Sequence, residues 1–180
     1  MKIMFISDIH GIKKNIEYIK IRFSETNCDK MVVLGDLYYA GAINDLNIDY
    51  DVNYIRKFLE TFKERLICMR GNCDSEFDIT KSNFPIISEI SLIKVDNLNI
   101  YLTHGNIYNI NNHEKIHENA ILVYGHEHIP YIKKIQNKTF INAGSISLPR
   151  NNLGPTYMIY NDRTFTIYNL ENKIIDKINF

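Results

Sequence analysis

The chain contains little cysteine, no excess charge of either sign and no long apolar run. Its three cysteines are too few and too widely spaced for a disulfide framework, so we expect reduced thiols. No apolar stretch approaches the ~20 residues that span a bilayer, and the N-terminal segment reaches a charged residue too early for a secretory signal. These absences argue against a disulfide-rich secreted protein and a membrane protein, and they predict a cytoplasmic location with no membrane partner.

The formal net charge is zero, from 21 basic and 21 acidic side chains. This balance argues against the broad basic surface that grips nucleic acid, and we expect no stable nucleic-acid partner. The hydrophobic content of 45% argues against a disordered chain. A length of 180 residues suits one compact domain. No linker or repeat divides the sequence, so residues 1–180 are predicted to form a single domain.

The first half of the chain alternates between strand and helix patterns. Short apolar runs predict strands over residues 2–7, 31–34 and 66–69. Apolar residues at helical spacing predict helices over residues 15–26 and 51–62. Strand–helix–strand units form parallel sheets, whose functional loops lie at the carboxyl ends of the strands. Residues 37–50 lack periodicity and are expected to form a long loop.

After Pro85 the pattern changes to hairpins, in which turn residues separate short apolar or alternating segments. The predicted strands are 88–95, 99–103, 121–124, 131–135, 139–141, 156–160, 164–170 and 173–178. Residues 106–119 are expected to form a loop that contains a short helix. The whole pattern predicts an α/β protein with mixed sheets.

Polar residues follow five of the predicted strands at the point where each strand ends. They are Asp8, His10, Asp36, Asn72, His104, His126 and His128. His126 and His128 are two residues apart, so in an extended segment both imidazoles point to the same face. One such residue after a strand is typical of a turn. Strand ends in a layered α/β sheet converge on one crevice, however, and the repetition therefore predicts a metal site there.

Seven such groups exceed what one divalent ion binds, and they suit two ions that share a carboxylate. Two ions about 3.5–4 Å apart can hold the attacking and leaving oxygens of a displacement at phosphorus. Carboxylate, amide and imidazole ligands favour Mn²⁺, with Fe, Zn²⁺ or Ni²⁺ as alternatives, over Mg²⁺ or Ca²⁺. We therefore expect two divalent ions, Mn²⁺ first among them, and a small phosphoester substrate.

The motifs that carry these residues resemble, in type and order, those of the calcineurin-like metallophosphoesterase family. The motifs are Asp8-x-His10, Gly35-Asp36, Gly71-Asn72, His104-Gly105 and Gly125-His126-Glu127-His128. Two further segments, Arg70-Gly71-Asn72-Cys73-Asp74 and Asn142-Ala143-Gly144-Ser145, are similar to the family's small bacterial and archaeal phosphodiesterase branch. The resemblance implies a four-layer α/β/β/α sandwich with mixed sheets and the site at one edge.

Position by position, the resemblance also implies a role for each ligand. The first metal would bind Asp8, His10, Asp36 and His128, and the second would bind Asp36, Asn72, His104 and His126. Asp36 would bridge the two ions, and a hydroxide between them would be the nucleophile. Asp36, Asn72, Cys73 and His104 would take part in catalysis.

Cys73 departs from the family pattern, because many relatives have a histidine there that assists the leaving group. A thiol with an ordinary pKa of ~8.5 is a poor proton donor to an alkoxide. The alternative is that Cys73 only fills space. Glu127 stands where threonine is common, and we expect it to face away from the ligands.

A few further side chains are weaker candidates. Arg70 either binds phosphate or forms an ion pair with Asp74 or Glu76. Tyr38 and Tyr39 either stack on a base or line a subunit interface. Self-association, if it occurs, is expected to give a homodimer or a homotetramer.

The sequence thus predicts a metal-dependent phosphodiesterase that acts on small phosphodiesters, and two alternatives stay open. A phosphomonoesterase would use the same metals but needs extra positive charge for the dianion, for which Arg70 and Arg150 are the obvious sources. A non-catalytic scaffold is the other alternative, because a retromer subunit shares this fold. Its branch lost site histidines, whereas every ligand position is filled here.

Overall fold

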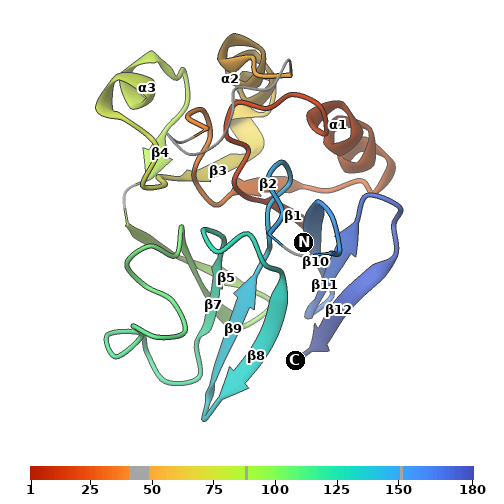
Figure 1. Cartoon of the computed structure of the whole chain (residues 1–180). Coiled ribbons are helices and arrows are strands. Elements are labelled where there is room, and N and C mark those ends of the chain that lie inside the picture. The colour runs from red at the N-terminus through yellow and green to blue at the C-terminus, as the bar shows by residue number, and fades with distance from the viewer. Residues whose placement is uncertain (41–48, 88, 151) are drawn as a thin grey trace.

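The computed structural model describes residues 1–40, 49–87, 89–150 and 152–180, and its strands form two mixed sheets (Figure 1). The strands of the first sheet are β1 (Ile3–Ile6), β2 (Lys30–Val33), β3 (Leu66–Met69), β4 (Ile86–Ile87), β10 (Thr156–Asn161), β11 (Thr164–Asn169) and β12 (Ile174–Asn179). Those of the second are β5 (Ile90–Val95), β6 (Leu98–Thr103), β7 (Ile121–Tyr124), β8 (Tyr131–Ile135) and β9 (Lys138–Asn142). The helices are α1 (Ile16–Glu25), α2 (Val52–Glu60) and α3 (Glu76–Lys81), with a 3₁₀ turn at Lys63–Arg65.

Both sheets are mixed, with three or more adjacent parallel strands and antiparallel strands beside them. The first sheet has the order β12-β11-β10-β1-β2-β3-β4, in which β1 to β4 are parallel and β10 to β12 pair antiparallel. The second has the order β5-β6-β7-β9-β8, in which β6, β7 and β9 are parallel. The parallel arrangement of β1, β2 and β3 agrees with the strand–helix–strand pattern of the sequence.

Alternation along the central strands divides the core into two layers. In β1, Met4 and Ile6 face α1 and α2, which supply apolar residues such as Ile19 and Ile55. Ile3 and Phe5 point to the opposite side, where they join residues of β6, β7 and β9 between the sheets. Because both faces of the strands are buried, these strands read as continuous apolar runs. The helices therefore cover one face of the first sheet, and the second sheet covers the other (Figure 1).

The outer face of the second sheet is covered by residues 106–120, which pack Ile116 and Ala120 against Leu122 and Phe140. This segment takes the place of the second helical layer in the expected α/β/β/α sandwich, and the short helix predicted within 106–119 is wrong. The segment consists of turns and bends. Asparagine side chains explain the difference, because they bond to nearby backbone groups and so compete with a helix. Asn109 donates to the Gly105 carbonyl at 2.7 Å, and its Oδ1 accepts from the Asn111 amide at 2.8 Å.

Two elements were not predicted, the helix α3 and the two-residue strand β4. α3 begins at a capping box in which Ser75 and Asp78 exchange hydrogen bonds. Most of the predicted loop over residues 37–50, namely 41–48, lies outside the described residues. No described helix is both long enough and apolar enough to cross a membrane.

The parallel strands of both sheets end at the same edge of the molecule. β1, β2 and β3 lead into Asp8, Asp36 and Asn72, and β6 and β7 lead into His104 and His126. Backbone hydrogen bonds join neighbouring strand ends within a sheet, for example from the Gly125 amide to the His104 carbonyl at 2.9 Å, and the two sheets are joined where the Ile146 amide, after β9, donates to the Ser7 carbonyl, after β1, at 3.0 Å. The fold therefore brings polar segments from distant parts of the sequence to one place.

Candidate metal centre

All seven predicted metal ligands come together in one chain of short contacts. Asp8 Oδ1 lies 3.2 Å from His128 Nε2 and 3.9 Å from His10 Nε2. Asp36 Oδ2 lies 3.6 Å from His10 Nε2 and 3.4 Å from His104 Nε2. The remaining two members surround His104, whose Nε2 is 3.0 Å from the Asn72 oxygen and 3.2 Å from His126 Nδ1. Asp36 thus stands between two sets of ligands.

The backbone at these positions is held in an uncommon conformation. Positive φ angles between 50° and 64° occur at Asp8, His10, Asp36, His126 and His128. Such angles cost energy for residues other than glycine, and they cluster at functional sites where the surrounding structure enforces them. Here the left-handed turns come immediately after the strands. They point the polar side chains that follow each strand into the cluster.

Two glycines of the motifs are required because ligand carboxylates lie against them. A Cβ atom on Gly71 would be 2.1 Å from Asp36 Oδ1 and 2.2 Å from the Asp36 nitrogen. A Cβ atom on Gly125 would be 1.8 Å from Ser7 Oγ and 2.5 Å from Asp8 Oδ2. The glycine before one ligand therefore leaves room for a ligand that follows another strand, in the same sheet for Gly71 and in the opposite sheet for Gly125.

Three of the histidines are oriented by backbone carbonyls. The Nδ1 atoms of His10, His104 and His128 lie 2.6, 2.7 and 2.6 Å from the carbonyl oxygens of Tyr39, Leu34 and Leu148. A carbonyl only accepts, so each Nδ1 donates its proton. In the neutral ring Nε2 then carries the lone pair, and all three Nε2 atoms face the cluster. This is the arrangement by which proteins fix metal-binding histidines.

Two features of this cluster favour a bound cation. In the neutral tautomers the lone pairs of His10 Nε2 and His128 Nε2 face each other at 3.3 Å. Asp8 Oδ1 is buried and accepts no hydrogen bond, although its partner oxygen Oδ2 accepts from the His126 amide at 3.0 Å. Buried acceptors without a donor are costly. A divalent ion between Asp8, His10 and His128 satisfies all three, so these residues fit a metal.

The second set of ligands attracts positive charge as well. Burial lowers the pKa of His104, but the hydrogen bond to Asp36 and the charges of Asp8 and Asp36 outweigh burial and raise this pKa to about 9. For Asp36, burial raises the pKa, yet His104 and the Cys73 amide outweigh it and hold the pKa well below its ordinary value. With protein groups alone, a proton on His104 Nε2 balances the negative charge of this region. A metal ion can take the place of that proton.

Within the part of the chain that the structure describes, potential ligand atoms within 4.8 Å of one another form three groups. Asp8, His10 and His128 form the first group, and Asp36, His104 and His126 form the second, to which Asn72 adds an amide oxygen. A third group, His10 with Asp36 and Cys73, connects them. Two adjacent groups that meet at one carboxylate match the arrangement that a pair of ions requires.

The comparison with protein families agrees with this geometry. The model of the calcineurin-like phosphoesterase superfamily domain matches residues 1–164. The chain belongs to the calcineurin-like phosphoesterase superfamily. The protein is therefore a hydrolase of a metal-dependent phosphoesterase family.

Curated relatives of this superfamily match nearly the whole chain. Phosphodiesterase YfcE of Escherichia coli K12 is 33% identical over 163 residues, which cover 90% of this chain and 89% of YfcE. The probable metallophosphoesterase YsnB of Bacillus subtilis is 26% identical over 166 residues, which cover 88% of this chain and 83% of YsnB.

Solved structures show the same fold. The structure of YfcE, a phosphoesterase from E. coli, has a TM-score of 0.94 at 30% identity and covers 99% of this chain and 98% of its own. A Vps29 structure with Zn²⁺ from Entamoeba histolytica has a TM-score of 0.66 at 19% identity and covers 99% and 98%. The second likeness shows the fold alone. The expected mixed-sheet metallophosphoesterase sandwich is confirmed.

Asp74 holds the backbone around Asp36 and Gly71 in place, and this role was not predicted from the sequence. It is buried and accepts from the amides of Asp36 at 2.9 Å, Leu37 at 2.8 Å and Gly71 at 2.8 Å. Burial raises the pKa of Asp74 to about 6, although the Gly71 and Leu37 amides act against it. The sequence contains a signal, since Asp74 is the last residue of the Arg70-Gly71-Asn72-Cys73-Asp74 segment that resembles the family.

Three further candidates from the sequence are Cys73, Arg70 and Glu127, and each has a defined hydrogen-bond or ion-pair partner. Cys73 donates its amide to Asp36 Oδ1 at 2.9 Å, and with protein groups alone burial together with Asp36 raises the pKa of its thiol to about 12. Arg70 pairs with Glu76 at 2.6 Å and not with the carboxylate of Asp74. Glu127 accepts from the Tyr131 hydroxyl at 3.1 Å, beside the centre and not in it.

Proposed function

We propose that this protein is a metal-dependent phosphodiesterase that hydrolyses small phosphodiesters. The observation that carries the proposal is the pair of ligand groups that meet at Asp36. The 33% identity to a protein named as a phosphodiesterase supports the same reaction. We also propose that the centre is dinuclear, with Asp36 as the shared ligand.

Two divalent ions bound there would supply a hydroxide nucleophile at neutral pH and would neutralise the phosphoryl oxygens. The protein's part is to hold the ligands in place. The Cys73 amide fixes Asp36 Oδ1, which leaves Oδ2 directed at His10 and His104. The carbonyls of Tyr39, Leu34 and Leu148 keep the imidazoles from rotating. Little reorganisation is then needed when substrate binds.

Mn²⁺ is the proposed metal, with Fe, Zn²⁺ or Ni²⁺ as alternatives. The ligands combine imidazole nitrogen with carboxylate and amide oxygen, which suits intermediate metals.

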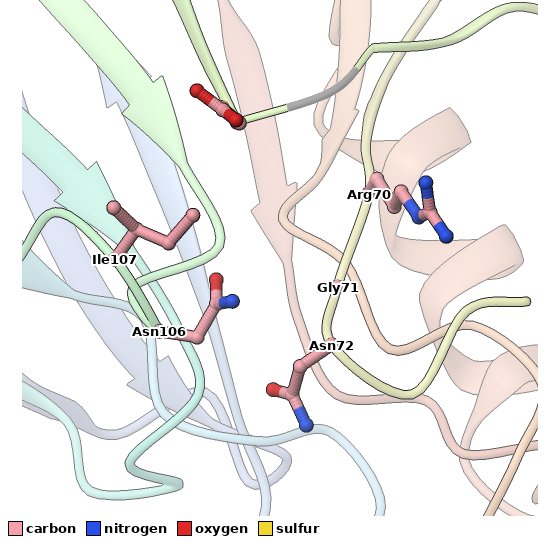
Figure 2. Close-up of a pocket in the computed structure, with 6 residues that line it drawn as sticks. Arg70, Gly71, Asn72, Asn106 and Ile107 are labelled. Carbon is pink, nitrogen blue, oxygen red and sulfur yellow. The ribbon is translucent and has the colours of Figure 1, made fainter.

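Charge beside the centre favours diesters over monoesters. A cavity of about 280 Å³ opens next to Asn72 and is lined by Arg70, Glu89, Asn106 and Ile107 (Figure 2). The guanidinium of Arg70 points away from Asn106 and Ile107 and is paired with Glu76 at 2.6 Å. Glu89 brings a negative charge to the same cavity. A monoester dianion would be repelled more strongly here than a diester monoanion.

The test compares activated diesters with activated monoesters. Metal-stripped protein supplied with Mn²⁺ is expected to hydrolyse bis(p-nitrophenyl) phosphate faster than p-nitrophenyl phosphate, and Asp36→Ala is expected to remove both activities. Asp162→Ala, in the exposed turn after β10, is the matched control and should behave as wild type. Faster monoester turnover would favour the monoesterase. A folded protein that binds no metal would favour the non-catalytic scaffold.

Several further features are proposed on the sequence alone. We propose a cytoplasmic location, which suits the three free cysteines. A homodimer or homotetramer, the lack of a stable nucleic-acid partner and the single domain over residues 1–180 stay predictions.

A further inference from the structure

Two cavities of different character adjoin the metal centre. One is the cavity beside Asn72 described above. The other, which we call the tyrosine cavity, has a volume of about 240 Å³ and is lined by Tyr38, Tyr39, Tyr50, Val52, Cys73 and Asp78. Asn72 lines the first cavity and its neighbour Cys73 lines the second. A phosphoryl group bound at the centre therefore has an open space next to it on each side of these two residues.

The walls of the tyrosine cavity are attached to the first ligand group at several points. Tyr39 accepts from His10 Nδ1 through its carbonyl oxygen at 2.6 Å. The ring of Tyr50 lies against Gly11, where an added Cβ would be 2.5 Å from a ring carbon. The sulfur of Cys73 is within 4.8 Å of ligand atoms of His10 and Asp36. A group in this cavity is thus directly beside a phosphorus atom bound at the centre.

The lining favours a neutral aromatic ring. Tyr39 is 49% exposed and Tyr50 is partly exposed, so both rings are accessible, whereas Tyr38 is buried and its hydroxyl bonds to Ser82 at 2.8 Å. Among the described residues, the lining includes no lysine or arginine. Its one carboxylate, Asp78, repels an anion and is already bonded to Ser75. Tyrosine faces bind flat rings by stacking, with little loss of side-chain freedom.

The cavity beside Asn72 differs in chemistry. Glu89 and Asn106 offer a carboxylate and an amide, and Ile107 is the main apolar surface. These groups suit an arm that carries hydrogen-bond donors. We propose that the substrate is an unsymmetrical phosphodiester whose aromatic arm, an aryl or nucleobase ring, binds in the tyrosine cavity. This inference rests on the proposed phosphodiesterase function and adds the class of substrate to it.

The test measures binding and does not depend on turnover. Protein loaded with Mn²⁺ is titrated calorimetrically with diphenylphosphinate and with dimethylphosphinate, whose P–C bonds the proposed enzyme cannot hydrolyse, and the ratio of the two dissociation constants is recorded for each variant. Both anions bind the metals through the same phosphoryl oxygens, so effects on the centre itself cancel in the ratio. Wild type is expected to bind diphenylphosphinate at least about tenfold more tightly, since an aromatic contact adds affinity that a methyl group lacks.

Variants then locate the aromatic arm. Tyr39→Ala and Tyr50→Leu are each expected to reduce the ratio by about fivefold, the effect of one stacking partner, while Tyr39→Phe keeps it. Ile21→Ala, an exposed change on α1, controls for general effects of an apolar truncation. Circular dichroism and elemental analysis verify folding and metal content, and both Tyr39 variants retain the backbone carbonyl that accepts from His10.

Three results would decide against the inference. They are an unchanged ratio in both tyrosine variants, a loss that occurs with Ile107→Ala instead, or equal loss in Tyr39→Ala and Tyr39→Phe. Failure of the proposed function looks different: the tyrosine variants lower the ratio as expected, but the wild type hydrolyses no diester.

Discussion

The two ligand groups of the centre differ in how far they are enclosed. In the first group Asp8, His10 and His128 are at most 3% exposed, and both histidines are held by backbone carbonyls. In the second group His104 is equally buried, but His126 is only partly buried and Asn72 is exposed. The same kinds of ligand therefore form one closed and one half-open site.

This difference has a functional meaning. A metal in the closed group is enclosed by fixed ligands and should bind tightly, because preorganised ligands lose little entropy. The half-open group lies beside the cavity that contains Glu89 and Asn106, so its ion is more accessible to substrate and to chelators. We expect the first site to anchor the centre and the second to exchange metal more readily.

The largest expected effect comes from Gly71→Ala, which removes no ligand. The new Cβ would lie 2.1 Å from Asp36 Oδ1, so the shared carboxylate or the Asn72 segment must move. Both groups should then bind Mn²⁺ poorly, and diester hydrolysis should fall to background. Gly154→Ala is the control, since nothing lies within 4 Å of its added Cβ; its positive φ of 73°, which Gly71 does not share, makes it the more strained backbone position of the two. If Gly71→Ala retains both ions, the close approach is not what shapes the centre.

A smaller effect should separate the two groups. Calorimetric titration of wild type with Mn²⁺ is expected to show a tight and a weaker phase. His128→Ala should remove the tight phase, because it opens the closed group, whereas His126→Ala should remove only the weaker one. His117→Ala, an exposed histidine outside the centre, should change neither. The opposite assignment of the two phases would show that enclosure does not determine affinity here.

A third substitution is expected to weaken metal binding by the second group, because it alters the hydrogen bonds to Asp74 that hold this group's backbone in place. Asp74 Oδ2 accepts from the Asp36 and Gly71 amides and Oδ1 accepts from Leu37. Asp74→Asn keeps one acceptor oxygen and turns an NH₂ group toward a backbone N–H, at a cost of ~1–3 kcal/mol. Groups behind metal ligands typically contribute about 10–100-fold in affinity or activity. We expect a loss of that size in the weaker phase, with the tight phase retained, and wild-type behaviour for Asp162→Asn.

The sequence was sufficient to predict which residues meet, because strand periodicity and the strand–helix–strand order place strand ends at one edge. Asp8, Asp36 and His104 each follow a buried apolar run, and these runs can be recognised in the sequence as strands. The capping box of α3 can also be recognised in the sequence, from Ser75 and Asp78, although α3 was not predicted. The helix expected in 106–119 was wrong because asparagine side chains, here at Asn109, bond to local backbone groups.

Other parts of the centre could not be predicted from residue types. The atoms that orient His10, His104 and His128 are backbone carbonyls of Tyr39, Leu34 and Leu148, and any residue supplies a carbonyl. Their positions depend on how loops from different strands pack together. The tyrosine cavity has the same origin: Tyr38 and Tyr39 were noted in the sequence, but only packing brings Tyr50 and Asp78 beside them.

The smallest expected effect concerns Glu127, which lies between the two histidines that serve different groups. Its carboxylate accepts from the Tyr131 hydroxyl at 3.1 Å, and Tyr131 in turn contacts the Tyr124 hydroxyl at 2.5 Å. Glu127→Gln preserves an acceptor oxygen, so both Mn²⁺ phases and the diester rate should stay within about twofold of wild type, as is usual away from a site. A large loss in the weaker phase alone would mean that Glu127 contributes charge to the half-open group, and the division of the centre would then include a residue outside the ligand set.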